Sequence, residues 1–468
     1  MHPRRFAVAV FSVALALGCS PDSGEDTLAI RGVTVIPGDG GAPLPGATVV
    51  VRGRFIEAVG VGVEPPPGAT VVEGEGRYLI PGLFEMHAHT SKTRASALGL
   101  YIANGVTTVR DAGGDHEELL AWRNEIRTGE RPGPRLLIAG PYLESADNVA
   151  RMRSTPPAEM VEPVERTRIP VGDPERARFV IDSLSELELD FLKIRTVQDA
   201  ETYRAIGAAA ESHGLRLTGH TFGISPEQQL QAGQDGVDHF LFPTLDSLTR
   251  SDRMALWERF AERGVVIVPT LYITREAATR TVESFREAVA DSLGEIDARR
   301  RYVSRFLLLD WREQALEATD RRELYRRIYD STVRNVREMH EAGVRVLPGT
   351  DVAVVDVYPG FSLHDELRVF VEDLELSEME TLVSATSESA AFLGIADSVG
   401  AIAPGMIADL VLLDADPLED ISNTTRIAGV FAGGAFFDRA GLERILEDVD
   451  TAPDQSVNDW PRSRGESR

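Results

Sequence analysis

Two histidines separated by one residue, His87 and His89, carry the strongest chemical signal in the sequence. The apolar run at residues 83–87 predicts a short strand that ends at His87, and His89 follows two residues later. Because alternate residues of a strand point to the same side, both imidazoles can reach one metal ion. The chain has a single cysteine, which excludes a cysteine-based zinc site. A metal would therefore be held by histidine, carboxylate or a less common ligand.

Four more polar residues fall at the ends of predicted strands: Lys193, His220, His239 and Asp351. Strand-like runs alternate with helix-compatible stretches, which predicts an α/β fold with a (β/α)8 TIM barrel. The eight predicted strands are 83–87, 105–111, 135–140, 191–195, 215–220, 236–240, 264–271 and 343–351. Catalytic groups of such a barrel gather at the C-terminal ends of its strands, so we expect all six residues to meet there.

Each of these residues also has a structural interpretation when it is taken alone. Lys193 could extend its ammonium group to solvent, and either His220 or His239 could be a core histidine bonded to the backbone. Asp351 could cap the turn that follows it. The six residues together, spread over five of the eight predicted strands, favour a metal site.

The segments that carry these residues resemble the metal-dependent amidohydrolase superfamily, in the branch of imidazolonepropionases and Xaa-Pro or Xaa-Arg dipeptidases. The resemblance covers most of residues 28–440. It rests on PGLFEMHAH at 81–89, GVTTVRDAG at 105–113, GTD at 349–351 and GAIAPGMIADLV at 400–411.

The resemblance implies a site with two divalent metal ions, usually zinc. The implied ligands are His87, His89 and Asp351 for one ion, His220 and His239 for the other, and Lys193, carboxylated by CO2, as the bridge. A carbamate needs the neutral amine, which burial beside cations favours. A metal-bridging hydroxide would attack the substrate carbonyl, and Asp351 would pass a proton to the departing amine. Histidine and carboxylate ligands also accept Mn, Co or Fe, which leaves the metal open.

The remaining histidines and two tyrosines carry weaker signals. Three residues near strand ends are candidates for contact with the substrate: Tyr142, Tyr272 and His116. Two histidines fall in last helical turns, where a cation meets the helix dipole, and are expected to be structural: His213 and His340. His364 is expected to support a ligand or to order a loop.

Both ends of the chain alternate short runs of β-forming residues with turns, and neither end could bury a hydrophobic core alone. We therefore expect one composite β-sandwich from residues 28–80 and 396–440, interrupted by the barrel at 81–395. Within the barrel, 145–176 is expected to form a loop over the active face and 273–342 long amphipathic helices. Residues 441–468 are expected to be a polar C-terminal tail.

The composition disfavours nucleic acid as a partner. Lys and Arg number 49 against 74 Asp and Glu, which gives a net charge of −25. Hydrophobic residues make up 43% and charged residues 26%, which is typical of a globular protein. The sequence leaves an oligomeric assembly open.

The N-terminus reads as an export signal. A basic start is followed by an apolar run too short to span a membrane comfortably, so residues 1–18 predict a signal peptide. Residues 16–19, Ala-Leu-Gly-Cys, resemble a bacterial lipobox, which implies cleavage before Cys19 and lipid on its thiol. Residues 19–27 would be a tether. The lipid would anchor the exported protein to the outer membrane, facing the periplasm, in a Gram-negative cell, and otherwise to the outer face of the cell membrane. A plain signal peptide or an uncleaved anchor is the alternative.

These observations predict a metal-dependent hydrolase of amide bonds, with a dipeptide, an N-acyl amino acid or another small amide as the substrate. The same site could serve a cyclic-amide, lactam or ester hydrolase. A non-catalytic binding lipoprotein on a degenerate barrel is the alternative from another class. Such a barrel should have lost ligands, whereas the set implied by the resemblance is complete here.

Overall fold

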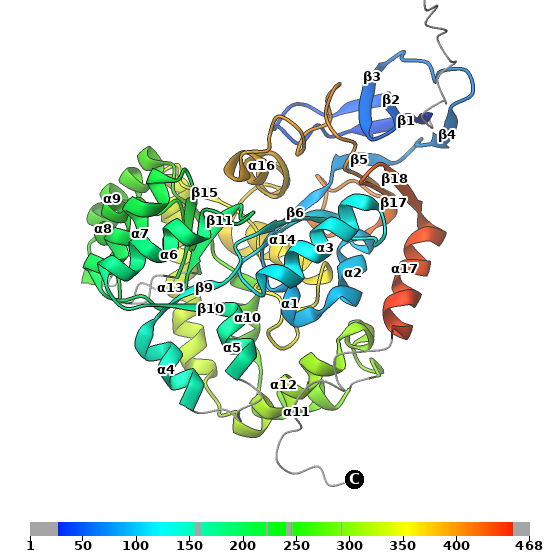
Figure 1. Cartoon of the computed structure of the whole chain (residues 1–468). Helices are drawn as coiled ribbons and strands as arrows, with labels where there is room; N and C mark the ends of the chain where they lie inside the picture. The colour runs from blue at the N-terminus through cyan, green and yellow to red at the C-terminus, as the bar shows by residue number, and fades with distance from the viewer. Residues whose placement is uncertain are drawn as a thin grey trace, which may run out of the picture.

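The computed structural model describes residues 27–154, 161–220, 223–239, 245, 247–291 and 293–452. The expected signal peptide, Cys19 and nearly all of the tether lie outside these residues. Figure 1 shows a sheet domain at the upper right, a barrel in the middle, and a group of helices on the side away from the sheet. Within the described part of the chain, no helix has the length and apolarity needed to cross a membrane.

The two ends of the chain form one eight-stranded sheet. Strand order is β18-β17-β16-β5-β1-β2-β3, with β4 paired to β1. The strands are β1 (Thr27–Val35), β2 (Leu44–Arg52), β3 (Phe55–Val61), β4 (Thr70–Glu73), β5 (Tyr78–Pro81), β16 (Leu410–Leu413), β17 (Ile427–Ala432) and β18 (Ala435–Asp438). Residues from both ends, among them Ile30, Val49 and Leu410, share one apolar core. The composite domain predicted from the sequence is thus present as a mainly antiparallel sheet.

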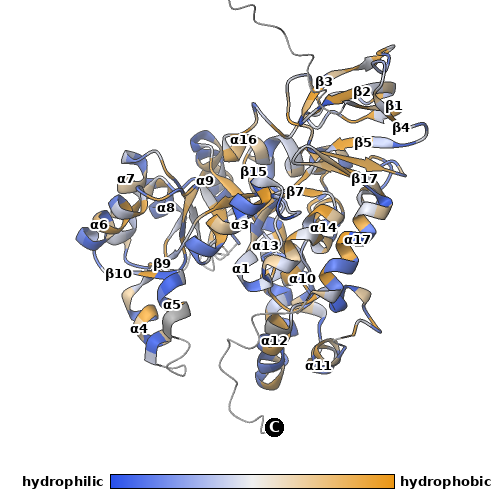
Figure 2. Cartoon of the chain, turned by 45° about the vertical axis from the view of Figure 1, so that its right-hand side comes forward, coloured by the Kyte–Doolittle hydropathy of each residue, from blue (hydrophilic) through white to orange (hydrophobic). Residues whose placement is uncertain are grey.

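Eight parallel strands form the barrel, at the positions that the sequence predicted. They are β6 (Leu83–Ala88), β7 (Val106–Asp111), β8 (Arg135–Ile138), β11 (Phe191–Ile194), β12 (Arg216–Gly219), β13 (Gly236–Asp238), β14 (Val266–Val268) and β15 (Arg345–Val346). Figure 2 shows these strands as mostly hydrophobic ribbons, consistent with strands that are covered on both faces.

Backbone hydrogen bonds close the barrel between its first and last strands. Met86 N donates to Pro348 O at 2.9 Å, and Asp351 N donates to His87 O at 2.8 Å. On the opposite side, Asp190 N donates to Ile138 O at 3.0 Å and joins the β8 and β11 regions. These bonds fix the segments that carry His87 and Asp351 side by side.

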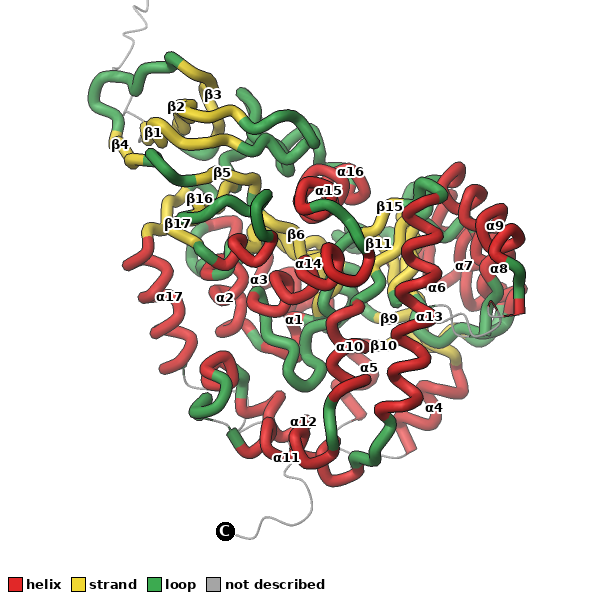
Figure 3. Tube along the Cα trace, turned by 180° about the vertical axis from the view of Figure 1, so that it is seen from behind, coloured by secondary structure: helices red, strands yellow, loops and turns green. Residues whose placement is uncertain are grey.

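Helices surround the barrel strands, as Figure 3 shows from behind. Those that follow or precede the strands are α1 (Thr90–Thr93), α2 (Leu98–Ala103), α3 (His116–Thr128), α6 (Pro174–Leu184), α7 (Ala200–Ser212), α8 (Pro226–Ala232), α9 (Arg250–Arg263), α13 (Arg322–Glu341), α14 (Phe361–Leu374), α15 (Glu378–Val383) and α16 (Ser389–Leu393). Several begin at side-chain caps: Ser225 and Thr249 each form a capping box. Short 3-10 or π turns are η1 (Ala95–Ala97), η4 (Ala298–Tyr302), η5 (Ser384–Glu388) and η6 (Ile421–Thr425).

Two excursions place further elements at the end of the barrel away from the sheet (Figure 1). The segment 145–176, which the sequence predicted as a loop, instead contains α4 (Ala146–Ser154), α5 (Val161–Thr167) and β10 (Arg168–Val171), which pairs in parallel with β9 (Tyr142–Ser145). Because proline and charged residues are frequent in this segment, its sequence did not predict these two helices and the strand. The segment 273–342 is helical as predicted, but it is divided into α10 (Leu271–Thr279), α11 (Val282–Ala290), α12 (Arg305–Glu317) and α13.

The predicted C-terminal tail is wrong for its first residues. Helix α17 (Arg439–Thr451) extends past residue 441, begins at the Asp438 cap, and buries Leu442 and Ile445. Ile445 packs so closely on α2 that a Cβ at Gly99 would lie 2.7 Å from its Cγ2. Apolar residues spaced by three on one face make this segment an amphipathic helix. Residues 453–468 lie outside the described part.

Candidate metal centre

The structure places the six predicted ligands together at the C-terminal ends of the barrel strands. They are His87 in β6, His89 just after it, Lys193 in β11, His220 after β12, His239 after β13 and Asp351 after β15. His87 is fully buried, Lys193 is 1% exposed and His89 is 8% exposed. Because all six residues lie at or just after the C-terminal ends of barrel strands, the fold brings together residues that are up to 264 positions apart in the chain.

Asp351 lies at the centre of the cluster. Its Oδ1 atom is 3.1 Å from His89 Nε2 and 3.5 Å from His87 Nε2, and its Oδ2 atom is 3.6 Å from His239 Nε2. The imidazole of His220 joins the group through His239, with ring centres 5.0 Å apart. One ligand atom each from His87, His239 and Asp351 lie within 4.8 Å of one another, which is the spacing of a metal site.

Sharp turns after three consecutive strands aim these side chains into the barrel mouth. His239, Thr270 and Asp351 all have positive φ angles, of 62°, 50° and 53°. Such angles are uncommon outside glycine and costly for a β-branched threonine. Thr270 Oγ1 lies 2.6 Å from His239 Nδ1, so the strained residue also orients this histidine. That contact leaves Nε2 of His239 facing Asp351.

A buried ion-pair network holds Lys193 from behind. Lys193 Nζ donates to Asp238 Oδ2 at 2.6 Å, and Arg110 donates to the other oxygen of the same carboxylate. Arg110 Nε also donates to Met86 O at 2.6 Å. Burial would raise the pKa of Asp238, but Arg110 and Lys193 hold it well below the usual range. The sequence analysis did not assign Asp238 or Arg110 to the site.

The electrostatics of the cluster suit metal binding. Burial lowers the pKa of His87 and His220 well below the ordinary value, and that of His89 to about 4. These imidazoles are thus neutral near pH 7, which is the form that binds metals. Burial would raise the pKa of Asp351, but the neighbouring histidines hold it well below its usual range, so it stays an anionic ligand.

Two further buried carboxylates support the backbone around the histidines. Glu85 accepts hydrogen bonds from His87 N at 2.9 Å and from Thr350 N and Oγ1 at 2.9 and 2.8 Å. It thereby ties β6 to the residue before Asp351. Asp111 accepts from Thr90 N at 2.7 Å and Oγ1 at 2.6 Å, and so fixes the segment after His89. Both acids lie in motifs that the sequence analysis quoted without giving these two residues a role.

The donor set fits a divalent metal. Neither ring nitrogen of the buried His87 makes a hydrogen bond in the described part of the structure. They lie 3.4 Å from Asp238 Oδ1 and 3.5 Å from Asp351 Oδ1. A buried imidazole with both nitrogens unsatisfied is costly unless a ligand occupies the space beside it. Histidine nitrogens and a carboxylate are ordinary ligands for zinc and its neighbours.

The three predicted substrate contacts take different places. Tyr142 is nearest: its hydroxyl lies 3.0 Å from His89 Nδ1, so it supports a predicted ligand. Tyr272 is the second residue of α10, where its backbone N–H donates to Glu366 at 2.6 Å. His116 begins α3 and borders Gly140, and no contact between described residues joins it to the cluster.

The other histidines have structural partners. His364 is buried, with Nδ1 2.9 Å from Thr424 Oγ1 and Nε2 3.0 Å from Asn104 O. It therefore orders the junction between the barrel and η6 and does not touch a predicted ligand. His213 lies 2.8 Å from the Asp182 carboxylate.

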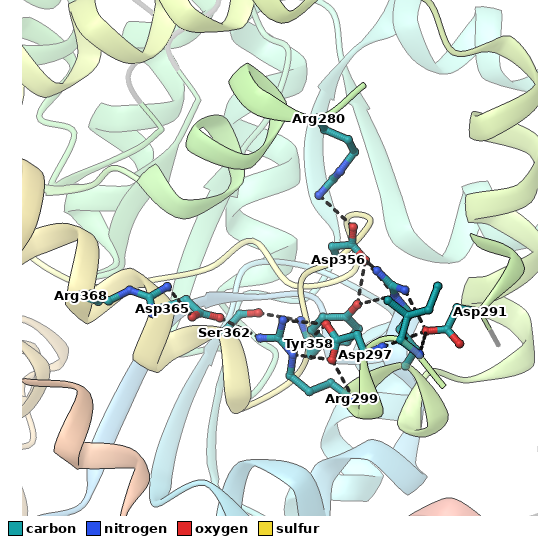
Figure 4. A network of polar contacts seen from close by, with 11 residues as sticks. Arg280, Asp291, Asp297, Arg299, Asp356, Tyr358, Ser362, Asp365 and Arg368 are labelled. Carbon is teal, nitrogen blue, oxygen red and sulfur yellow. Dashed lines mark hydrogen bonds and ion pairs between the residues drawn. The ribbon is translucent and has the colours of Figure 1, made fainter. Parts of the chain in front are cut away.

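A network of arginines and aspartates braces the loop that follows Asp351, as Figure 4 shows. Asp356 accepts a hydrogen bond from Tyr358 Oη at 2.7 Å and pairs with Arg280 at 3.2 Å. Arg299 links Asp297 to Asp365 on α14 with contacts of 2.8 and 2.9 Å. Segments from the 273–342 excursion thus hold the last loop of the barrel mouth in place.

Comparison with known proteins places this geometry in a family. The model of the amidohydrolase family matches residues 78–436. The chain belongs to the amidohydrolase family. It is therefore a hydrolytic enzyme that acts on carbon–nitrogen bonds, in a family that is typically metal-dependent.

Solved structures of this family share the fold. A prolidase complexed with N-methylphosphonate-L-proline is 21% identical, with a TM-score of 0.67 over 88% of this chain and 100% of that one. Ochratoxinase of A. niger is 19% identical, with a TM-score of 0.65 over 88% of this chain and 96% of that one. A curated adenine deaminase of Rubrobacter xylanophilus is 39% identical over 70 residues, which span 14% of this chain and only 12% of the deaminase.

Proposed function

We propose that this amidohydrolase cleaves the amide bond of small peptides or N-acyl amino acids with the help of two divalent metal ions. The observation that carries the proposal is the convergence of six ligand-type residues at the barrel mouth, with one atom each from His87, His239 and Asp351 within 4.8 Å. The structural similarity to a prolidase with a bound proline analogue supports small peptide-like substrates.

In this proposal His87, His89 and Asp351 hold one ion, while His220 and His239 hold the other. Bound there, the ions would supply the Lewis acidity that activates water and polarises a carbonyl. Asp351 is anionic and central, so its carboxylate can accept a proton from the attacking water and return it to the leaving nitrogen. The turn at Thr270 keeps the imidazole of His239 oriented during this transfer.

Lys193 is proposed to bridge the two ions as a carbamate. Burial lowers the pKa of its amine, which raises the fraction of the neutral form that can react with CO2. After carboxylation the side chain would be anionic, and Asp238 would keep its ion pair with Arg110.

Elemental analysis tests the proposal most directly. Protein that begins at residue 20, purified without chelators, should contain about two transition-metal ions per chain, and it should hydrolyse members of a dipeptide and N-acyl amino acid panel. Lactams and simple esters in the same panel test the two related activities. A reproducible absence of metal, even after addition of zinc and bicarbonate, would favour a binding lipoprotein.

We further propose that the mature protein is exported and anchored by lipid on Cys19. The basic and apolar start followed by Ala-Leu-Gly-Cys supports this location. In cells fed a labelled fatty acid, the wild type should carry the label and sediment with membranes. The Cys19→Ser variant should do neither, and a membrane-bound Cys19→Ser protein would point to an uncleaved anchor instead.

A further inference from the structure

Lysine is almost absent from this chain: one lysine is a predicted metal ligand, and the other lies three residues after His89. The sequence contains 47 arginines but only Lys92 and Lys193. Lys193 is the proposed carbamate, a role that arginine cannot take. Lys92 lies in α1, which begins directly after His89. All the other basic side chains of the Lys and Arg type are arginines, so a compact ammonium group this close in sequence to a predicted ligand is unusual for this chain.

The ammonium group of Lys92 is unpaired within the described part of the chain. No hydrogen bond or ion pair joins its ammonium group to another described residue. The residue is exposed, yet burial lowers its pKa; among the charges around it, Asp351 raises this pKa, and Arg195 and Arg168 lower it. Asp310 raises the pKa as well, although neither acid forms an ion pair with Lys92.

The two arginines flank the tyrosine that touches His89. The guanidinium carbons of Arg168 and Arg195 lie 5.2 and 5.9 Å from the centre of the Tyr142 ring. The Tyr142 hydroxyl is 3.0 Å from His89 Nδ1. The ring of Tyr142 thus lies between the two guanidinium groups and a predicted metal ligand, and the charges of both arginines act on Lys92.

Charge within this group is not balanced. Both arginines share one carboxylate partner, Glu144, whose Oε1 lies 2.8 Å from Arg195 Nη1 and 3.5 Å from Arg168 Nε. Among the described carboxylates, Glu144 is the one in contact with any of these three cations, and Asp351, which acts on Lys92, is a predicted metal ligand. Clustered, partly desolvated cations repel one another unless anions approach them.

We propose that Lys92, Arg168 and Arg195 form a subsite for two carboxylates of the substrate, so that the enzyme acts on acyl or peptidyl derivatives of an acidic amino acid. This inference rests on the proposed amide hydrolysis at the adjacent metal centre. Arginine forks bind carboxylates through paired hydrogen bonds, and a lysine adds a compact point charge. One carboxylate would meet the arginines beside Tyr142, and the other would meet the ammonium group of Lys92.

A matched pair of substrates tests this subsite. N-acetyl-L-glutamate and N-acetyl-L-glutamine have the same size and differ in one side-chain charge. The wild type should show at least a tenfold higher kcat/KM for the glutamate compound, and Lys92→Gln should reduce this ratio about tenfold. Because no described residue forms a hydrogen bond or an ion pair with Lys92, the substitution should leave the Tm unchanged. Arg178→Gln, which removes an exposed charge on α6, is the control and should keep the wild-type ratio.

Calorimetric binding of the same two compounds to the metal-loaded protein separates this inference from the proposed function. Tighter binding of N-acetyl-L-glutamate to the wild type, lost in Lys92→Gln, supports the subsite even if neither compound is hydrolysed; in that case the proposed activity on these amides fails alone. Equal binding of the two compounds to the wild type overturns the subsite. A preference that survives in Lys92→Gln, Arg168→Gln and Arg195→Gln also overturns it, because the metals alone would then select the charge.

Discussion

At the scale of single residues, Lys193 is the most informative side chain of the metal centre. The variants Lys193→Ala and Lys193→Arg should both lose the bridge, and their metal content should fall from about two ions per chain to one or fewer. Arginine keeps the ion pair with Asp238 but cannot form a carbamate, so it separates lost charge from lost chemistry. Elemental analysis and activity measure both effects.

An active Lys193→Ala enzyme with unchanged metal content, and with no bicarbonate or short carboxylate added, would contradict the bridging role. Circular dichroism must show that the variants fold. Asp238 retains Arg110 in each of them, so we expect the fold to survive. The loss of one partner of a buried carboxylate should cost about 1–3 kcal/mol of unfolding free energy.

The Tyr142 hydroxyl should raise the metal affinity of the site through its contact with His89. Removing its hydroxyl in Tyr142→Phe leaves Gly113 O, at 3.3 Å, as the remaining polar contact of His89 Nδ1. Partners of this kind orient a ligand and raise its basicity, so metal affinity should fall by about tenfold. Competition with a chromogenic chelator measures the change. Tyr78→Phe on the sheet domain is the control, and an equal loss there would rule out a role through His89.

The ligand set could be predicted from the sequence because each member follows an apolar run that ends a barrel strand. The partners of these residues could not. Nothing in one sequence shows that Asp238 accepts the Lys193 ammonium group, because the two residues are 45 positions apart and meet only through the pairing of β11, β12 and β13. Similarly, the contact between Tyr142 and His89 depends on how the two loops fold over the strand ends.

At the scale of elements, Glu366 controls where α10 begins. Its carboxylate accepts the backbone N–H groups of Leu271 and Tyr272 at 2.9 and 2.6 Å. Burial raises the pKa of Glu366 to about 8, far above that of an unfolded glutamate. Between about pH 4.5 and pH 8 the folded state therefore binds more protons than the unfolded state, and this group makes stability fall as pH rises.

Glu366→Gln should flatten that dependence. The slope removed is at most about 1.4 kcal/mol per pH unit, since one proton is involved. Denaturant titrations of wild type and variant at pH 5, 6, 7 and 8 measure the difference. If the two slopes agree across this range, Glu366 does not retain a proton in the folded state.

The elements themselves were predicted unevenly, and for physical reasons. Barrel strands are short, buried and β-branched, so they stand out between turns. Helices α4 and α5 were missed because proline and charge dominate 145–176, and their neighbours in space decide their structure. Helix α17 was missed because its apolar face is narrow, with Leu442 and Ile445 as the buried residues.

At the scale of the whole molecule, Asp409 joins the sheet to the barrel. Its carboxylate accepts from Arg135 Nη2 on β8 at 3.0 Å and from Gly433 N at 3.3 Å, and its backbone oxygen accepts from Gly82 N at 2.8 Å. Asp409 is 6% exposed, so the pair is largely shielded from water. Asp409→Asn should lower the unfolding free energy by about 1–3 kcal/mol.

The same variant tests whether the two parts unfold together. The tryptophans at 122, 257 and 311 report on the barrel region, whereas far-ultraviolet circular dichroism also reports on the sheet. We expect coincident transitions by both methods in the wild type and in Asp409→Asn, at a lower denaturant midpoint for the variant. An early transition seen only by circular dichroism would mean that the sheet unfolds separately.

The composite sheet also sets the order of events during synthesis. Strand β5 lies between β1 and β16, and its partner residues Pro81 and Leu410 are 329 positions apart. Until the ribosome has added nearly the whole chain, β5 keeps one open edge that can pair with another strand. Contacts of such long range form slowly and leave a nascent chain exposed to aggregation. Chaperone protection should therefore matter most just before β16 emerges, and a chain released earlier would be a target for proteolysis.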